Sequence, residues 1–124
     1  MLTIRAAQFE AMRRQRRDAF LQRACRTIHE LLAAAGRPAD PGFLLPRVQA
    51  GIARALAFQL LSEHDIIDYL KAGFLYCDGF QFPHPTIQEI AFLSTGGLPS
   101  DRVQRFSRWA RSAWESKGQI NHGQ

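Results

Sequence analysis

Apolar residues recur every three or four positions along most of this chain, which is the period of an amphipathic helix. Residues that alternate strictly between apolar and polar, as in a half-buried strand, form no stretch of useful length. The pattern therefore predicts an all-α fold, a compact single domain built as a bundle of about five helices. The stretches that carry it are residues 4–35, 46–61, 63–77, 86–94 and 101–117.

Helix-terminating and helix-initiating residues flank these stretches. Thr3 is an expected N-cap for the first helix, and Gly36 is suited to end it. Pro46 is expected in the first turn of the second helix, because the fixed backbone angle of proline suits that position. Ser62 and Thr86 each precede an acidic residue three positions later, the arrangement of a capping box.

Two positions interrupt the regular pattern. Gly51 lies inside the second helix, where it costs about 1 kcal/mol relative to alanine, so we expect a close crossing with another helix there. The apolar residues around it, Val48, Ile52, Ala55, Leu56 and Leu60, have helical spacing. Residues 78–85 (DGFQFPHP) cannot be helical throughout. Their aromatic side chains, Phe80 and Phe82, either fill the core under a long loop or form a protein-binding surface.

The first helix carries two arginines inside its apolar stripe. Arg13 and Arg17 fall in the middle of this sector, and an unpaired buried charge is costly. Either the first turns of the helix project beyond the core, or these arginines meet an anionic partner. The stripe itself consists of Phe9, Phe20, Ala24, Thr27, Leu31 and Ala35.

Charge is distributed unevenly along the chain, whose formal net charge is +5. Residues 1–37 hold eight arginines against three acids, residues 38–100 hold three bases against six acids, and residues 101–124 hold five bases against two acids. Part of this asymmetry is consistent with pairing between an acidic middle and basic ends. Arginine outnumbers lysine strongly, and its planar guanidinium suits bidentate recognition of carboxylates or phosphates.

Size and composition bound the class of protein. A chain of 124 residues with 46% hydrophobic residues fits one soluble domain. No apolar run approaches the roughly 18 residues that cross a bilayer, and the N-terminus has no secretory h-region, so we expect a cytoplasmic protein that does not enter a membrane. Its cysteines, Cys25 and Cys77, are then expected to be reduced thiols.

Motifs for catalysis or metal binding are weak. The pairs Cys25/His29 and His64/Asp68 have a spacing of four residues, but neither meets a second pair that would complete a metal site. The sequence has no glycine-rich phosphate loop, no GxSxG and no HExxH motif. We therefore expect no enzyme activity, no metal and no cofactor.

Nucleic-acid binding is a second hypothesis for the arginines. The last helix sets Trp109 among four arginines, and an exposed tryptophan can stack on a base. Those arginines step by three residues and so fan around the helix, and no helix-turn-helix signature is present. They are Arg102, Arg105, Arg108 and Arg111.

Several segments resemble a group of small bacterial proteins found with type VI secretion effectors. Residues 2–9 (LTIRAAQF) are similar to the start of that group, and Phe20 to the end of the helix that follows. Its central pattern is similar to residues 48–54 (VQAGIAR), 61–70 (LSEHDIIDYL), 73–75 (GFL) and 79–83 (GFQFP). The resemblance covers most of residues 1–90 and departs at residues 13–17, where the group would have more alanine and glutamate. It implies a non-enzymatic helical protein that acts beside a secreted toxin as chaperone, adaptor or immunity partner.

Our leading prediction is a helical module that binds another protein, an effector or toxin, as its adaptor or chaperone. Nucleic-acid binding and an immunity role are the alternatives, and the sequence does not fix the oligomeric state. Arginines docking on an acidic surface, with apolar neighbours that exclude water, would provide the mechanism. The predicted contact residues are Arg13, Arg16, Arg17 and Trp109, followed by Phe80 and Phe82.

Overall fold

Five α-helices joined by short connectors make up the computed structural model of the chain. It describes residues 2–81 and 84–122, with side chains described over residues 11–81 and 84–117. These residues form no strand, so the all-α prediction is confirmed. The helices are α1 (Leu2–Ala34), α2 (Pro41–Ala57), α3 (Glu63–Tyr76), α4 (Ile87–Leu93) and α5 (Pro99–His122).

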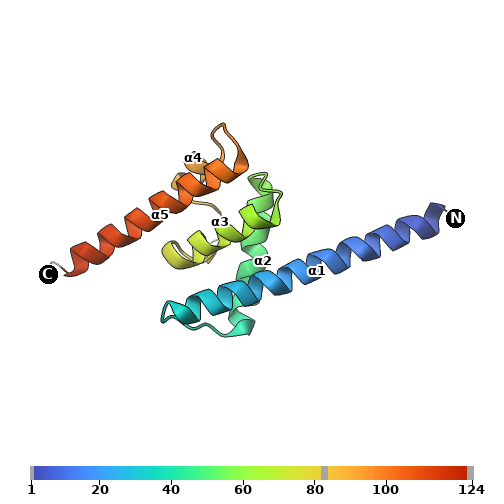
Figure 1. Cartoon of the computed structure of the whole chain (residues 1–124), viewed down its shortest axis with the longest axis horizontal. Helices are drawn as coiled ribbons and strands as arrows, with labels where there is room; N and C mark the ends of the chain where they lie inside the picture. The colour runs from blue at the N-terminus through green and yellow to red at the C-terminus, as the bar shows by residue number, and fades with distance from the viewer. Residues whose placement is uncertain (1, 82–83, 123–124) are drawn as a thin grey trace.

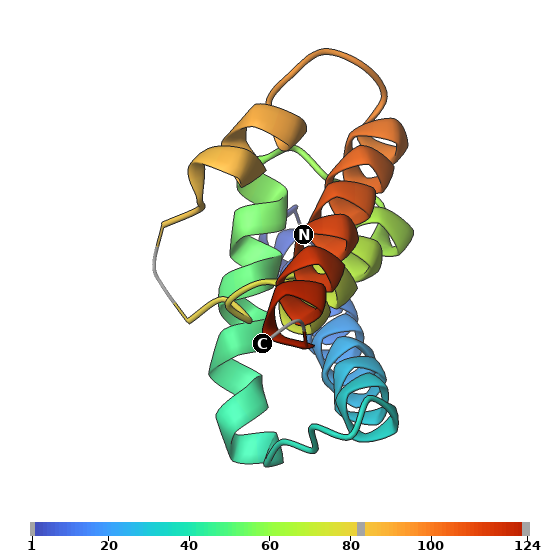
Figure 2. The ribbon, with the colours of Figure 1, turned by 90° about the vertical axis from the view of Figure 1, so that its left-hand side faces the viewer.

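The third helix is the centre of the bundle. It packs against α1, α2 and α5, while α1 also contacts α2, and α4 packs against α5. The N-terminal half of α1 and the last turns of α5 extend beyond the body at opposite ends of the molecule (Figure 1). The connector that leaves α3 passes α2 before the chain enters α4 (Figure 2).

The predicted helix ends are confirmed at several positions. Gly36 has a φ of 76°. The amide of Arg37 donates to the Leu32 carbonyl at 2.8 Å, so that α1 ends in a Schellman motif. Ser62 accepts a hydrogen bond from the Asp65 amide at the start of α3. Thr86 forms the full capping box at the start of α4.

The second helix differs from the prediction at both ends. It begins at Pro41, which follows the N-cap position Asp40, and Pro46 therefore lies inside the helix. At this sixth helical position Pro46 has no amide hydrogen to donate to the Gly42 carbonyl, so the helix lacks one intrahelical hydrogen bond. The helix ends at Ala57, since Gln59 takes a left-handed φ of 63°. The Leu60 amide then donates to the Ala55 carbonyl at 2.9 Å.

The other helices differ less. α1 spans Leu2–Ala34, so Thr3 lies inside the helix and the prediction of Thr3 as its N-cap is wrong. α5 spans Pro99–His122 and is longer at both ends than predicted. Gly118 lies inside α5, where glycine costs only about 1 kcal/mol relative to alanine.

The buried face of α1 starts later than its sequence pattern suggests. Among the described side chains of α1, Ala24, Ile28 and Leu32 lie in the core, and Phe20 is only half-buried. Ala35, expected at the end of the stripe, is exposed. Among the described side chains of α1, which begin at residue 11, the core-facing sector is thus confined to the C-terminal half of the helix, and Phe9 lies outside them.

Gly51 marks a close helix crossing, as predicted. A Cβ atom at this position would overlap the Leu70 side chain of α3 and lie 3.1 Å from the Phe80 ring. Gly73 of α3 has the same function, since its Cβ would lie 2.6 Å from Cε2 of Phe80. The two glycines leave the space that the Phe80 ring occupies against Tyr69, at a centroid distance of 5.3 Å.

Candidate functional site

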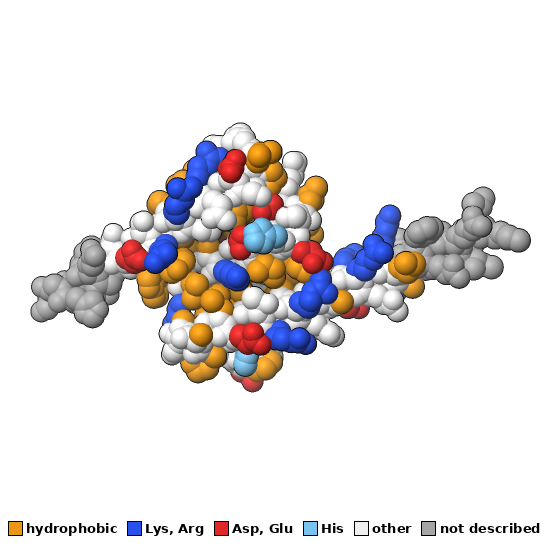
Figure 3. Space-filling view, viewed as in Figure 1, with side chains coloured by type: hydrophobic (Ala, Val, Ile, Leu, Met, Phe, Trp, Pro, Cys, Tyr) orange, Lys and Arg blue, Asp and Glu red, His pale blue; other side chains and the backbone are white. Residues whose placement is uncertain are grey.

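The N-terminal half of α1 carries its arginines outside the core. Residues 11–19 are all exposed, among them Arg13, Arg16 and Arg17. Basic side chains line the stretch of α1 that leaves the body (Figure 3). Of the two explanations for arginines in an apolar stripe, the structure shows the first: this half of the helix projects beyond the core.

An apolar groove begins where α1 meets the body. It has a volume of about 360 Å³ and lies between α1, α2 and the start of α3. Arg16 and Arg17 line it, and each lies one turn before an apolar lining residue of α1. The apolar lining consists of Phe20, Leu21, Ile52, Leu56, Leu61 and Ile66.

The turn between α2 and α3 shapes the far wall of this groove. Because Gln59 is left-handed, Leu60 turns into the core and is fully buried, while Leu61 points outward with 77% of its surface exposed. Leu56, close to the end of α2, is 48% exposed. Exposed leucines that line one groove form a contiguous apolar patch, and such a patch on a water-facing surface is typical of an interaction site.

Electrostatics give the groove a basic rim. Glu63, one of its two carboxylates, accepts hydrogen bonds from Nη2 of Arg23 at 2.9 and 3.0 Å. Within the described part of the chain, no carboxylate pairs with Arg13, Arg16 or Arg17. Asp18 is the other acid in the lining. The expected internal pairing between the acidic middle and the first helix thus occurs at Arg23.

Phe80, a predicted contact residue, lies in the core. It is 4% exposed, and its backbone has a left-handed φ of 61°. Asp78 Oδ1 accepts its amide hydrogen at 3.1 Å. A ring held among Gly51, Gly73 and Tyr69 cannot serve as a surface contact, so the alternative of a core residue under the loop is correct. Phe82 lies outside the described residues.

Trp109 also has neighbours within the domain. Its ring is half-buried. The ring centroid lies 5.7 Å from that of Phe92 of α4 and 6.2 Å from that of Phe106 of α5. It covers the core between these two helices. The Trp109 ring is therefore not free to stack on a nucleic-acid base. It also does not line the groove.

The arginines of α5 mostly bind their own chain. Arg102 donates to the carbonyls of Leu93 and Phe58, and Arg105 donates to the Gly96 carbonyl at 3.2 Å. Arg111 pairs with Glu115 at 3.1 Å on the same helix. These contacts give the fanned arrangement a structural explanation that needs no external ligand.

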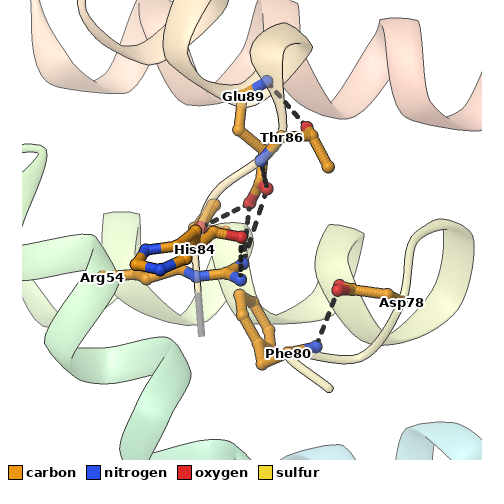
Figure 4. A network of polar contacts seen from close by, with 7 residues as sticks. Arg54, Asp78, Phe80, His84, Thr86 and Glu89 are labelled. Atoms are coloured by element: carbon orange, nitrogen blue, oxygen red, sulfur yellow. Dashed lines mark hydrogen bonds and ion pairs between the residues drawn. The ribbon is translucent and has the colours of Figure 1, made fainter. Parts of the chain in front are cut away.

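A buried polar network, which the sequence pattern does not predict, joins α2, α3 and α4 (Figure 4). The Glu89 carboxylate accepts the Tyr69 hydroxyl hydrogen at 2.6 Å, the Thr86 amide at 2.8 Å and the Arg54 guanidinium at 3.4 Å. Arg54 also donates to the His84 carbonyl at 2.7 Å. The charged pair is almost fully buried, so it fixes the connector and α4 to the bundle and does not face a ligand.

Burial also affects the titration of the groups near this network. Burial, followed by the hydrogen bond and the charge of Glu89, raises the pKa of Tyr69. Burial, followed by the charges of Glu89 and Asp78, raises the pKa of Cys77 to about 11. Burial alone raises the pKa of Cys25. Both cysteines are free thiols, and at neutral pH they are protonated.

The spaced pairs of potential ligands do not converge. His64 and Asp68 pair at 3.1 Å on α3, and Asp65 accepts a hydrogen bond from Ser100 at 2.9 Å. Across residues whose side chains are described, no three His, Cys, Asp or Glu groups come close enough to hold a metal ion. The groove is the site where two predicted contact residues, Arg16 and Arg17, lie beside an apolar surface.

Comparisons with known proteins do not indicate a function. No family model, no curated protein and no solved structure matches this chain. Over the described ranges, no helix combines the length and the apolar character needed to cross a membrane.

Proposed function

We propose that this protein is a non-enzymatic protein-binding module that docks its partner in the groove beside Arg16 and Arg17. The observation that carries the proposal is the groove itself, an apolar surface with a basic rim on an otherwise well-packed bundle. Leu61 and Leu56 expose large apolar surface there, and burying such surface is the main source of affinity between proteins.

The arrangement suits a macromolecular partner better than a small molecule. Leu56 and Leu61 are 48% and 77% exposed, so the groove is open to solvent, whereas a small-molecule site usually buries most of the surface of its ligand. The exposed arginines lie at the edge of the groove, where charge steers association and selects the partner. An apolar centre with a charged rim is the common anatomy of a transient protein interface.

The finer proposal is that the protein acts in the cytoplasm as an adaptor or chaperone for a secreted type VI effector or toxin. It rests on the resemblance of residues 2–9 and 48–83 to small proteins found with such effectors. An immunity role is the alternative within the same class. An immunity protein that inhibits a nuclease is often acidic, whereas the rim of this groove is basic. The rim therefore favours an adaptor or chaperone that loads a partner with an acidic surface.

Nucleic-acid binding is the second candidate, and one observation favours it. Arg13 and Arg14 are exposed on a projecting helix and have no described carboxylate partner, so they could contact phosphates. The arginines of α5 support it less, since Arg102, Arg105 and Arg111 are engaged within the chain.

Affinity capture from the native host, with and without nuclease, tests the proposal. We expect a protein partner that survives nuclease treatment and moderate salt, because an apolar interface is less sensitive to salt than phosphate contacts are. Recovery of nucleic acid alone, lost on nuclease treatment, would support the second candidate and overturn the first.

A further inference from the structure

We propose that the groove receives an amphipathic helix of the partner, with apolar side chains facing the groove and carboxylates on the flank that faces Arg16 and Arg17. This inference rests on the proposed function and specifies the chemistry of the segment that is bound. Three features of the site support it: the apolar lining, the absence of a strand edge among the described residues around it, and the sign of its unpaired charge.

The apolar lining requires apolar side chains from the occupant. Leu56 and Leu61 stand on the far wall and Phe20 and Leu21 on the near wall, while Ile66 lies at the start of α3. A partner that left these side chains exposed to water would gain little binding free energy. A partner that filled the groove would bury apolar surface from three helices at once. Adjacent apolar side chains must therefore enter together from one face of the bound segment.

The secondary structure around the groove favours a helix over an extended segment. A β-strand peptide gains affinity by adding a strand to a sheet edge, and the described residues of this chain form no strand. A helix satisfies its own backbone hydrogen bonds and presents side chains three and four residues apart on one face. It can therefore lie against α1 and α2 in the way that helices of a bundle pack together.

The positive charge at the rim favours a bound helix that carries carboxylates on one flank. Arg16 and Arg17 line the groove without a described carboxylate partner, and Glu63 is already paired with Arg23. A carboxylate of the bound helix would meet a guanidinium in bidentate geometry at the edge of an apolar surface, where screening is weaker than in bulk water. A second copy of this chain would bring further arginines of α1 close to these two, so like charges oppose self-association here.

Designed peptides test the occupant directly. The probe is a fluorescein-labelled synthetic helix of about 18 residues, with leucines along one face and glutamates on the flanks. One control peptide has the same composition with the leucines scattered around the helix. A second control keeps the leucines and replaces each glutamate by lysine. Binding to the whole protein is followed by fluorescence anisotropy.

Two variants of the protein and their matched controls complete the design. Leu61→Ser removes an apolar wall residue, and Leu98→Ser removes a leucine of similar exposure (77% and 68%) that does not line the groove. Arg16→Glu with Arg17→Glu reverses the rim. Arg105→Glu with Arg108→Glu lowers the net charge by the same amount on α5. Circular dichroism confirms that each variant is folded.

We expect the glutamate helix to bind, and both controls to bind at least about tenfold more weakly. Leu61→Ser should weaken binding about tenfold and Leu98→Ser should not. The Arg16→Glu, Arg17→Glu protein should prefer the lysine helix, while the α5 variant keeps the original preference. Absence of binding by the glutamate helix, or equal binding of the scattered peptide, would overturn the inference.

Two further outcomes separate this inference from the proposed function. If the unmodified protein is a dimer and Leu61→Ser makes it a monomer, the groove is an interface between copies and the inference is overturned. If Leu61→Ser abolishes host capture of a protein partner but the glutamate helix does not bind, docking in the groove stands and the inference about the bound segment fails. Recovery of nucleic acid alone contradicts both.

Discussion

Arg23 of α1 holds Glu63 of α3 through one guanidinium nitrogen, which lies 2.9 and 3.0 Å from the two carboxylate oxygens. This pair stands at the edge of the groove and connects the helix that carries the arginines to the central helix. Because Glu63 is occupied, it does not neutralise Arg16 and Arg17, which lie about two turns earlier on α1. Asp18 is then the remaining acid of the groove lining, and the rim keeps a basic character.

Charge reversal on the projecting half of α1 should leave the fold intact. Arg13 and Arg17 are exposed and have no described carboxylate partner. Arg13→Glu with Arg17→Glu should therefore change the free energy of unfolding by about 0.5 kcal/mol or less. Partner capture should be lost. The helical signal in circular dichroism and the urea midpoint check the first point, and host capture checks the second. Unfolding of this variant would show that the two arginines are internal struts.

Local signals predicted much of the fold. Ser62, Thr86 and Gly36 have the expected capping roles, because each depends on a few neighbouring residues and on backbone geometry. Pro41 and Pro46 are both compatible with the first turns of a helix, and the pattern favoured the wrong one. The end of α2 was harder to predict than its start, because Gln59 has a left-handed conformation that glutamine rarely adopts.

The candidate site could be predicted only in part. The arginines were recognisable because they interrupt an apolar stripe. Leu56 has the spacing of a core residue, and its exposure depends on how α1 and α2 cross, which the sequence pattern does not specify. Glu89 was recognised as a capping residue, but its contacts with Arg54 and Tyr69 join residues 35 and 20 positions apart. Such contacts follow from tertiary packing alone.

Gly73 should be intolerant of a methyl group. In Gly73→Ala the new Cβ would overlap Cζ of the Phe80 ring and lie 2.6 Å from its Cε2, and Tyr69 and Phe74 hold this ring in place. We expect this overlap to lower the free energy of unfolding by about 2 kcal/mol. Gly96→Ala is the matched control, because no atom lies within 4 Å of its Cβ position. Urea unfolding measures both. Equal stabilities for the two variants would mean that the ring moves freely.

The Tyr69 hydroxyl should contribute measurably to stability. Tyr69→Phe removes a hydrogen bond of 2.6 Å to a buried carboxylate. Its loss should cost about 2 kcal/mol, since the carboxylate stays buried with one donor fewer. The control is Tyr76→Phe, at a half-buried tyrosine outside this network.

The control change should cost less than about 0.5 kcal/mol in urea unfolding. Neither tyrosine lines the groove, so peptide binding by the folded protein should be unaltered in both variants. A Tyr69→Phe protein as stable as the Tyr76→Phe protein would show that the network adds little.

Cys77 should react slowly with alkylating reagents in the native protein. Its pKa is raised from 9.0 to about 11, so at pH 8 the fraction of reactive thiolate is on the order of a hundredfold below that of an ordinary thiol. Iodoacetamide labelling followed by mass spectrometry measures the rate, with the urea-unfolded chain as control. Similar rates in the two states would contradict the burial of this thiol.

The same raised pKa has a consequence for stability. Between pH 9 and about 11 the unfolded chain releases the Cys77 proton while the native chain retains it, so unfolding becomes easier as the pH rises. The stabilising contribution is complete below pH 9 and is lost as the pH passes the native pKa. Cys77→Ala should reduce the slope of unfolding free energy against pH in this window. An unchanged slope would assign the effect to Tyr69 and Cys25, whose pKa values are also raised.

Site-specific photo-crosslinking in the native host identifies what binds in the groove. A photoreactive amino acid replaces Leu61 in one variant and Leu98 in a second, since both leucines are exposed and only Leu61 lines the groove. We expect a single protein adduct at position 61, located by mass spectrometry in an acidic amphipathic segment of the partner, and no such adduct at position 98. Equal adducts at both positions, or nucleic acid bound at position 61, would contradict it.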